Sequence, residues 1–157
     1  MADTSVTHAT FIVERSYKAS PAKVFAALSD PAIKRRWYAE GDSHDVVTFD
    51  SDCRPGGADR LHYRFGAGTP FPGVVLQNDG HHQNVVTNER IVTTSAMTLD
   101  ERPISVSLTT YELLPTDAGT DLICTNQVAF FEGSDGPVMR ERGWRTLLDK
   151  LGEAVES

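Results

Sequence analysis

The residues with the clearest capacity for chemistry lie near the C-terminal end of the chain. Arg140 and Trp144 are four residues apart in the segment GPVMRERGWRTLLDKLGEAV, residues 136–155. On an α-helix this spacing places Arg140 about 40° from Trp144, within the apolar stripe of the segment. A cation on that stripe must reach solvent or meet an anion. The pair predicts either a clamp for a ligand carboxylate or an internal acid, or an arginine that stays in water beyond the edge of a sheet.

The two tryptophans of the chain, Trp37 and Trp144, carry rings that can stack on an apolar or aromatic ligand. The alternative for both is packing in the core. For Trp144 the helical spacing of its apolar neighbours favours packing. Trp37 lies near the end of a short helical segment and next to Tyr38, which favours a position at the mouth of a pocket.

A third group of candidates comes from segments that alternate between apolar and polar residues. In ADRLHYRF, residues 58–65, Tyr63 and Phe65 share a face with Leu61. If this face turns inward, Tyr63 brings a hydroxyl into a cavity. Tyr111 and Asn126 offer polar groups from later strands, but their parity conflicts with the apolar face or is ambiguous. Such groups suit a binding site and equally the acid–base work of a cyclase, and the sequence leaves both open.

Histidines and cysteines give weaker signals. His81 and His82 are adjacent, so on an extended chain they point apart, and His62 adds no recognisable ligand spacing. Cys53 and Cys124 lie outside any metal-ligand pattern. No serine lies in a GxSxG motif, and no glycine-rich segment matches a phosphate-binding loop. The sequence therefore predicts no metal, no cofactor and no catalytic residue.

Composition narrows the classes of partner. The net charge is −7, which argues against nucleic acid and against an anionic membrane surface, because both require a basic patch. Two cysteines far apart suit a reducing compartment. The first residues show no charged segment followed by an apolar core, and no apolar run approaches the roughly 20 residues of a membrane span. We expect a cytoplasmic protein.

The order of elements follows from periodicity and turn residues. We expect a flexible N-terminus over residues 1–9 and one domain over residues 10–157, which begins with a strand over 10–19. Ser20 and Pro21 favour the start of a helix, and Pro31 favours a second short one. Six strands should follow and pair antiparallel, separated by the turns 54–57, 66–70, 78–84, 100–103 and 115–120.

The segment 136–155 closes the chain as a long helix with an apolar stripe. Gly143 and Gly152 flank this stripe, and their missing side chains would let a neighbouring strand or loop approach the helix backbone. An antiparallel sheet with one apolar face needs a cover. We predict an α+β helix-grip fold: a curved antiparallel sheet of about seven strands wrapped around the C-terminal helix, with two short helices after the first strand.

This order resembles the START-like, or SRPBCC, helix-grip superfamily, and within it the family named after the C-terminal domain of the activator of the heat-shock-protein-90 ATPase. The resemblance covers roughly residues 10–155 and rests on five stretches in the expected order: SPAKVFAALSDPAIKRRWY, DSDCRPGGADRL, NERIVTT, TTYELLPTDAGTDLICTNQ and GWRTLLDKL. It implies a cavity between the sheet and the C-terminal helix. The chain lacks the separate N-terminal domain and the Asn/Trp-rich motif of the eukaryotic co-chaperone, so activation of a chaperone ATPase is poorly supported.

We therefore expect non-catalytic binding of a small hydrophobic or aromatic ligand. The alternatives are a polyketide cyclase-like or hydrolase-like enzyme, and a protein-binding module related to stress response. A protein partner has no support in the sequence, which also does not predict an oligomeric state. The ligand-binding residues predicted are Trp37, Tyr63, Phe65, Met97, Leu108, Phe130, Arg140 and Trp144.

Overall fold

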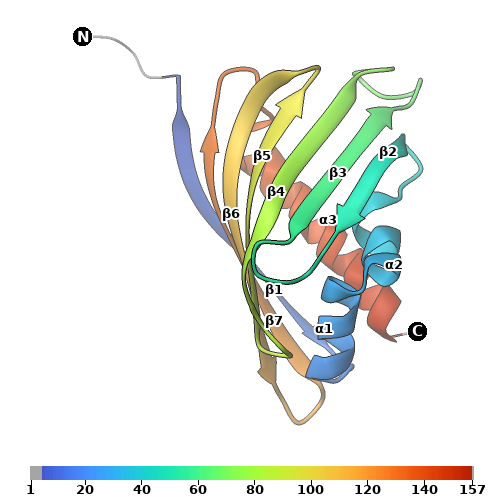
Figure 1. Ribbon diagram of the computed structural model, residues 1–157, viewed down its shortest axis with the longest axis vertical. Coiled ribbons are helices and arrows are strands. Elements are labelled where there is room, and N and C mark those ends of the chain that lie inside the picture. Colours follow the sequence, from blue (N-terminus) through green and yellow to red (C-terminus); the bar gives the residue numbers. More distant parts are fainter. Residues whose placement is uncertain (1–4, 157) are drawn as a thin grey trace.

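The structure is a computed structural model that describes residues 5–156. Residues 1–4, part of the expected flexible N-terminus, lie outside the described residues. Seven strands and four helical segments follow one another along the chain (Figure 1). They are β1 (Thr7–Tyr17), α1 (Pro21–Ser29), α2 (Pro31–Lys34), the π-helical turn η1 (Arg35–Ala39), β2 (His44–Ser51), β3 (Ala58–Phe65), β4 (Val75–Val86), β5 (Arg90–Leu99), β6 (Arg102–Pro115), β7 (Thr120–Phe130) and α3 (Gly136–Glu156).

The strands form one antiparallel sheet with the order β1-β7-β6-β5-β4-β3-β2. The six strands after the first two helices form a meander, because short connections make successive strands pair. β1 closes the far edge beside β7. Figure 1 shows α3 running diagonally across one face of the curved sheet, with α1 and α2 near the end of β2. The predicted α+β helix-grip fold is confirmed.

Local signals set the helix starts as predicted. The Ser20 hydroxyl accepts a hydrogen bond from the backbone N–H of Lys23 at 3.2 Å, which caps α1. The carboxylate of Asp30 accepts one from the N–H of Ala32 at 2.9 Å and caps α2. Pro21 and Pro31 occupy the first turns of the two helices, where the missing N–H costs nothing.

β1 begins at Thr7, three residues before the expected start of this strand. Its first residues are small or polar on both faces, so alternation gives no sign of the strand there. Pairing with β7 defines it instead, since Thr7 lies opposite Phe130 at the end of an unbroken register.

The predicted turn over residues 78–84 is wrong, because this segment is the middle of β4. It pairs with β3 on one side and β5 on the other, so its polar backbone is satisfied in both directions. A Cβ at Gly80 would lie 1.9 Å from the carbonyl oxygen of Thr94, so the glycine here marks a close strand contact rather than a turn. The chain reverses at residues 87–89, where Asn88 adopts a φ of 64°.

The C-terminal half of α3 forms the core contact with the sheet. Leu148, Leu151 and Val155 are buried against it. The Tyr17 hydroxyl donates a hydrogen bond of 2.6 Å to the carbonyl oxygen of Leu148 and holds β1 against the helix. A Cβ at Gly152 would lie 3.0 Å from Cε1 of Tyr17, so this glycine permits the close approach predicted from the sequence. Gly143 differs, because a Cβ there would meet no atom within 4 Å.

The two helical glycines give a matched pair of substitutions. We expect Gly143→Ala to raise the free energy of unfolding by about 1 kcal/mol, since alanine favours the helix and meets open space. Gly152→Ala should lower it, because the added methyl presses on a tyrosine ring that its hydrogen bond holds in place. Urea unfolding of both variants measures the difference. Equal effects would contradict the different surroundings of the two glycines.

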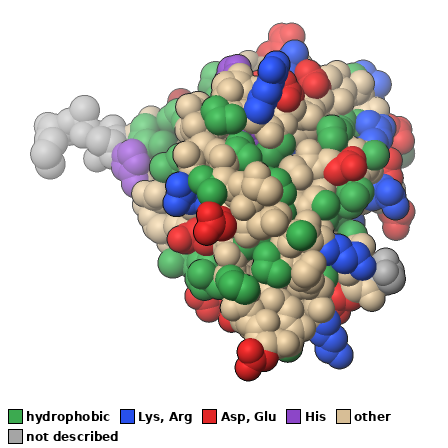
Figure 2. Space-filling model, turned by 60° about the horizontal axis from the view of Figure 1, so that its bottom comes forward, with side chains coloured by type: hydrophobic (Ala, Val, Ile, Leu, Met, Phe, Trp, Pro, Cys, Tyr) green, Lys and Arg blue, Asp and Glu red, His purple; other side chains and the backbone are tan. Residues whose placement is uncertain are grey.

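The surface carries both signs of charge. Figure 2 shows basic and acidic side chains interspersed on one face, with apolar groups between them. Within residues 5–156, no helix combines the length and the apolar character that a membrane crossing requires.

Candidate functional site

A cavity of about 520 Å³ lies between the sheet and the N-terminal half of α3. Strands β3 to β7 supply its floor, α3 its roof, and Tyr38 of η1 and His44 of β2 part of its side. Phe71 and Met139, both largely exposed, mark its mouth. Its volume falls within the roughly 300–1,000 Å³ typical of sites for small molecules.

Five of the eight predicted residues line this cavity. They come from the two strands β3 and β5 and from α3, and they are Tyr63, Phe65, Met97, Arg140 and Trp144. The alternation in β3 places Tyr63 and Phe65 on the inner face as expected. The structure thus brings together residues separated by up to 81 positions in the chain, from Tyr63 to Trp144.

Trp37 does not line the cavity, so the prediction that it lies at the mouth of a pocket is wrong. Its side chain is 1% exposed and belongs to the hydrophobic core. The indole N–H donates a hydrogen bond of 2.8 Å to the carbonyl oxygen of Ala27 in α1. The neighbouring residue, Tyr38, faces the cavity instead, because consecutive residues of a helical turn point in different directions.

Leu108 is also misplaced by the prediction. The cavity-facing residues of β6 include Ser107, Thr109 and Tyr111, so Leu108 lies on the outer face. A bulge in β6 changes which residues face the cavity. Met97 pairs with Ser105 and Thr98 pairs with Pro103, so Ile104 has no opposite residue and is the extra residue of the bulge. The apolar residues before and after the bulge therefore do not share one face.

Phe130 lies behind the cavity wall rather than in it. The ring is 2% exposed, and the Arg140 guanidinium carbon lies 5.1 Å from its centroid. This cation–π contact holds the arginine side chain along the wall. Phe130 does not line the cavity, so the prediction that it contacts a ligand is corrected. Its ring instead supports the side chain of Arg140.

Arg140 is committed to a protein partner. Its Nε and Nη2 donate hydrogen bonds to the two carboxylate oxygens of Asp135, at 2.7 and 2.8 Å, and Nη2 also donates to the Ser105 hydroxyl at 3.0 Å. Burial acts to raise the pKa of Asp135, but the hydrogen bonds and charge of Arg140 outweigh it and hold that pKa below its usual value. The internal acid that the sequence left open is therefore Asp135, and the arginine is not in water, since its side chain is only 10% exposed.

Aromatic rings form two groups along the cavity. Trp144 lies between Tyr38 and Tyr111, with ring centroids 6.4 and 6.1 Å away. Nearer the mouth, Tyr63 and Phe65 are in contact at 5.2 Å. Rings on several sides offer faces and edges to a flat apolar molecule.

Polar groups of the cavity interact mostly with one another. Asn78 Nδ2 donates to the Tyr38 hydroxyl at 3.3 Å, and the Thr109 hydroxyl donates to Asn126 Oδ1 at 2.8 Å. Asn78 Oδ1 is buried without a hydrogen-bond partner among the described residues. Rotating the Asn78 amide by 180° would exchange its two polar atoms and leave the other one unpaired.

Four residues of the cavity lining were not predicted from the sequence: Tyr38, Asn78, Ser95 and Ser107. Alternation gives only a weak signal for Asn78 in β4, Ser95 in β5 and Ser107 in β6, because polar residues occupy both faces of these strands. Tyr38 lies in the helical turn η1, where alternation gives no signal. Tyr111 and Asn126, whose parity was ambiguous, both line the cavity.

A buried ion pair supports this wall from behind. Lys34 Nζ donates to Asp59 Oδ1 at 2.8 Å, and the two side chains are 4% and 13% exposed. The same ammonium lies 4.7 Å from the centroid of the Tyr38 ring. Asp59 lines the cavity, but its charge is already balanced.

The tyrosines of the cavity are neutral hydrogen-bonding groups at neutral pH. Burial raises the pKa of Tyr111 well above its usual value, and burial together with the Asp59 charge does the same for Tyr38. A phenol of this kind can donate a proton in a hydrogen bond but does not act as a base. The arrangement is therefore suited to holding a molecule by contact and hydrogen bonding.

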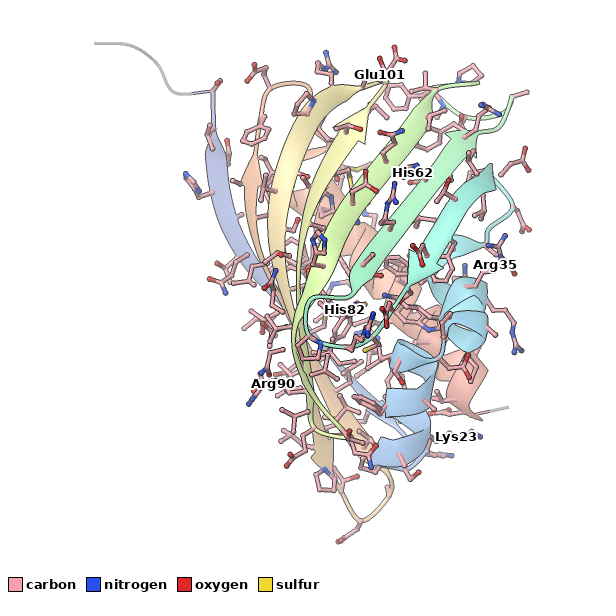
Figure 3. The ribbon with its side chains drawn as sticks, in the orientation of Figure 1. Lys23, Arg35, His62, His82, Arg90 and Glu101 are labelled. Atoms are coloured by element: carbon pink, nitrogen blue, oxygen red, sulfur yellow. The ribbon has the colours of Figure 1, made fainter. Side chains whose placement is uncertain are left out.

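The adjacent histidines have separate surroundings, as expected for a strand. His81 is exposed, whereas His82 is 1% exposed and faces inward. Figure 3 shows His62 and His82 apart, on β3 and β4. Among residues 5–156, no cluster of three or more His, Cys, Asp or Glu side chains is arranged to hold a metal ion.

His82 predicts a loss of stability in acid. Burial lowers its pKa; Asp59 opposes this shift and Lys34 adds to it. Below about pH 6.5 the unfolded chain therefore binds a proton that the folded chain does not, and the free energy of unfolding falls. Urea unfolding at about pH 7.5 and about pH 5.5 should show a larger fall for wild type than for His82→Gln. Equal falls would contradict a buried neutral His82.

Comparisons with known proteins agree with this architecture. The model of the Activator of Hsp90 ATPase homolog 1-like protein family matches residues 18–156. No protein with a curated description matches the sequence significantly.

Solved structures of bacterial proteins are similar over nearly the whole chain. A protein of Rhizobium leguminosarum is 35% identical, with 97% of each chain covered and a TM-score of 0.89. A protein of Rhizobium loti is 40% identical, with coverage of 96% of this chain and 99% of its own, and a TM-score of 0.79. A protein of Chromobacterium violaceum is 25% identical, with coverage of 94% and 98% and a TM-score of 0.77.

The family match spans most of the sequence, and the seven-stranded sheet around α3 has the corresponding helix-grip architecture. This chain therefore belongs to the family of Activator of Hsp90 ATPase homolog 1-like proteins.

Proposed function

We propose that this protein binds a small, largely apolar ligand in the cavity beneath α3 and does not convert it chemically. The observation that carries the proposal is the cavity itself, about 520 Å³, whose lining combines aromatic and aliphatic side chains with polar groups that are largely paired with one another. Protein interiors are normally packed to the density of organic crystals, with few voids larger than a water molecule. A space of this size inside a small domain is well suited to a guest.

Gly143 supports the same proposal. It lies in the middle of α3, lines the cavity, and has open space where a Cβ would be. A glycine in a helix costs about 1 kcal/mol relative to alanine. Gly143 therefore makes the helix less stable than an alanine would, at a position where a larger side chain would occupy cavity space.

The charged groups of the cavity favour binding over catalysis. Asp59 and Asp135 could serve as bases, but each is paired with a cation, Lys34 and Arg140 respectively. Two other side-chain hydrogen bonds between cavity residues, Tyr38 with Asn78 and Thr109 with Asn126, join neutral groups. Acid–base catalysis works best with a group whose pKa lies near the working pH.

We assign the protein to the cytoplasm as part of the same proposal. Cys53 and Cys124 are both free thiols, which fits a reducing compartment.

The proposal is tested by filling the cavity from α3. We expect Gly143→Met to fold normally and to reduce the affinity for naphthalene by about tenfold or more, because its side chain occupies the binding space. Fluorescence titration measures the affinity. Thr146→Met is the matched control, since Thr146 is exposed on the same helix and does not line the cavity.

Native mass spectrometry of gently purified protein adds a direct test, since a carrier should retain a small molecule. Absence of naphthalene binding by wild type, or equal binding by Gly143→Met, would contradict the proposal.

A further inference from the structure

A row of small residues crosses three neighbouring strands of the sheet beneath the cavity. Gly80, Ser95 and Ser107 lie side by side on β4, β5 and β6. Ser95 and Ser107 line the cavity floor, and Gly143 lines its roof on α3. Small residues on both walls leave part of the space between sheet and helix unfilled.

Tyr111 reaches this space with an unpartnered hydroxyl. The residue is 4% exposed and lines the cavity, and its hydroxyl makes no hydrogen bond to any described residue. This hydroxyl is not one of the fully enclosed unpartnered polar atoms, so it is accessible from the cavity. Tyrosine hydroxyls in apolar surroundings usually find a hydrogen-bond partner, so an accessible hydroxyl without one in the protein is available to a ligand. The other aromatic hydroxyl at this end of the cavity, that of Tyr38, already accepts a hydrogen bond from Asn78.

Within residues 5–156, the charged groups that line the cavity are already paired. Asp59 is paired with Lys34, and Asp135 with Arg140. The His44 Nε2 lies 2.6 Å from the carbonyl oxygen of Ala39, to which it donates. An ionised ligand would be buried without a counterion, which is costly, so a neutral ligand is favoured.

Resting on the proposed function, we propose that the cavity selects a neutral aromatic ligand that carries a hydrogen-bonding oxygen, and that the Tyr111 hydroxyl binds this oxygen. The rings of Trp144 and Tyr38 then pack against the ligand, since Trp144 lies between Tyr38 and Tyr111. The partner that the Tyr111 hydroxyl lacks in the protein is supplied by the ligand.

Three probes of one shape separate these features: naphthalene, β-naphthol and β-naphthoate. We expect wild type to bind β-naphthol roughly fivefold more tightly than naphthalene, the ratio that one hydrogen bond provides. It should bind the anion β-naphthoate about tenfold more weakly than β-naphthol, because a buried charge finds no partner. Fluorescence titration gives the three dissociation constants.

Tyr111→Phe should remove the preference, so that β-naphthol and naphthalene bind with similar affinity. Its unliganded stability should not fall, because the lost hydroxyl makes no hydrogen bond in the protein. Tyr63→Phe is the matched control: Tyr63 lines the same cavity, but it is half-buried and lies beside His44 and Phe65 near the mouth. It should retain the preference.

The outcomes separate this inference from the function on which it rests. If no probe binds, the proposed function fails. If naphthalene and β-naphthol bind equally, or Tyr111→Phe keeps the preference, the cavity binds ligands but the role of Tyr111 is overturned. If β-naphthoate binds most tightly, Arg140 exchanges Asp135 for the ligand carboxylate, and the preference for a neutral ligand is overturned.

Discussion

Replacing Lys34 with methionine is expected to lower the free energy of unfolding by about 3 kcal/mol. Lys34 is 3% exposed and holds Asp59 through a contact of 2.8 Å. Methionine replaces much of the apolar stem, but Asp59 keeps a charge that has lost its partner inside the protein. The main cost is this uncompensated carboxylate, since removing one member of a buried pair is far more costly than removing both.

A double variant tests that explanation. Lys34→Met/Asp59→Asn removes both charges and should recover most of the lost stability, measured by urea unfolding. The exposed pair of Arg54 and Asp52, with side chains 75% and 45% exposed, is the matched control. Arg54→Met should change stability by less than about 0.5 kcal/mol. If Lys34→Met has an effect as small as that, the ion pair is not effectively buried.

The Lys34 variant also bears on the binding site. Asp59 lines the cavity, so the single variant places an unpaired carboxylate in its wall. We expect weaker binding of apolar probes by Lys34→Met than by the double variant, because an ionised wall retains water that an apolar molecule must displace.

The fold followed from the sequence because its signals are local. Ser20 and Asp30 cap the helices that begin after them, and the stripe on α3 identifies the face that packs on the sheet. The prediction of a turn over residues 78–84 was wrong because the structure of this segment depends on distant parts of the chain. Asn78 to Asn84 are polar and contain a glycine, and only pairing with two neighbouring strands makes them a strand.

The site was predictable where the periodicity of an element is regular, as on α3, which supplies Arg140 and Trp144. β3 alternates regularly, so Tyr63 and Phe65 were placed correctly on the inner face. In β6 the extra residue at Ile104 depends on pairing with β5, and no pattern within β6 reveals it. This is why Leu108 was chosen and Tyr111 was left ambiguous.

The partners of charged residues could not be predicted for a related reason. Lys34 and Asp59 are 25 residues apart, and their contact exists only once α2 lies over β3. Asp135 precedes the helix that carries Arg140, so the spacing of the helix gives no indication that the two side chains meet.

Substitution of Trp37 should mainly affect stability, whereas substitution of Trp144 should mainly affect binding. Trp37→Ala is expected to lower the free energy of unfolding by about 3–5 kcal/mol, because it leaves a void in the core and an unpaired carbonyl at Ala27. That is a large share of the roughly 5–15 kcal/mol that stabilises a domain. Trp37→Phe, which keeps a ring, provides a milder variant and should cost about 1–3 kcal/mol.

Compared with Trp37→Ala, Trp144→Ala should lower the free energy of unfolding less and should weaken ligand binding more. Trp144 is half-buried beside an existing cavity, so its removal enlarges an open space rather than creating a closed one. We expect a loss of about 1–2 kcal/mol in the free energy of unfolding. The affinity for naphthalene should fall by about tenfold, since the ring between Tyr38 and Tyr111 is gone.

Measuring stability and naphthalene affinity for both tryptophan variants gives a result that neither measurement provides alone. Trp37→Phe should unfold more easily while the folded fraction binds naphthalene as wild type does, because Trp37 does not line the cavity. If Trp37→Phe weakened binding and Trp144→Ala did not, the guest would occupy a different space, and the cavity beneath α3 would not be the binding site. The contrast therefore tests where a ligand binds independently of what the ligand is.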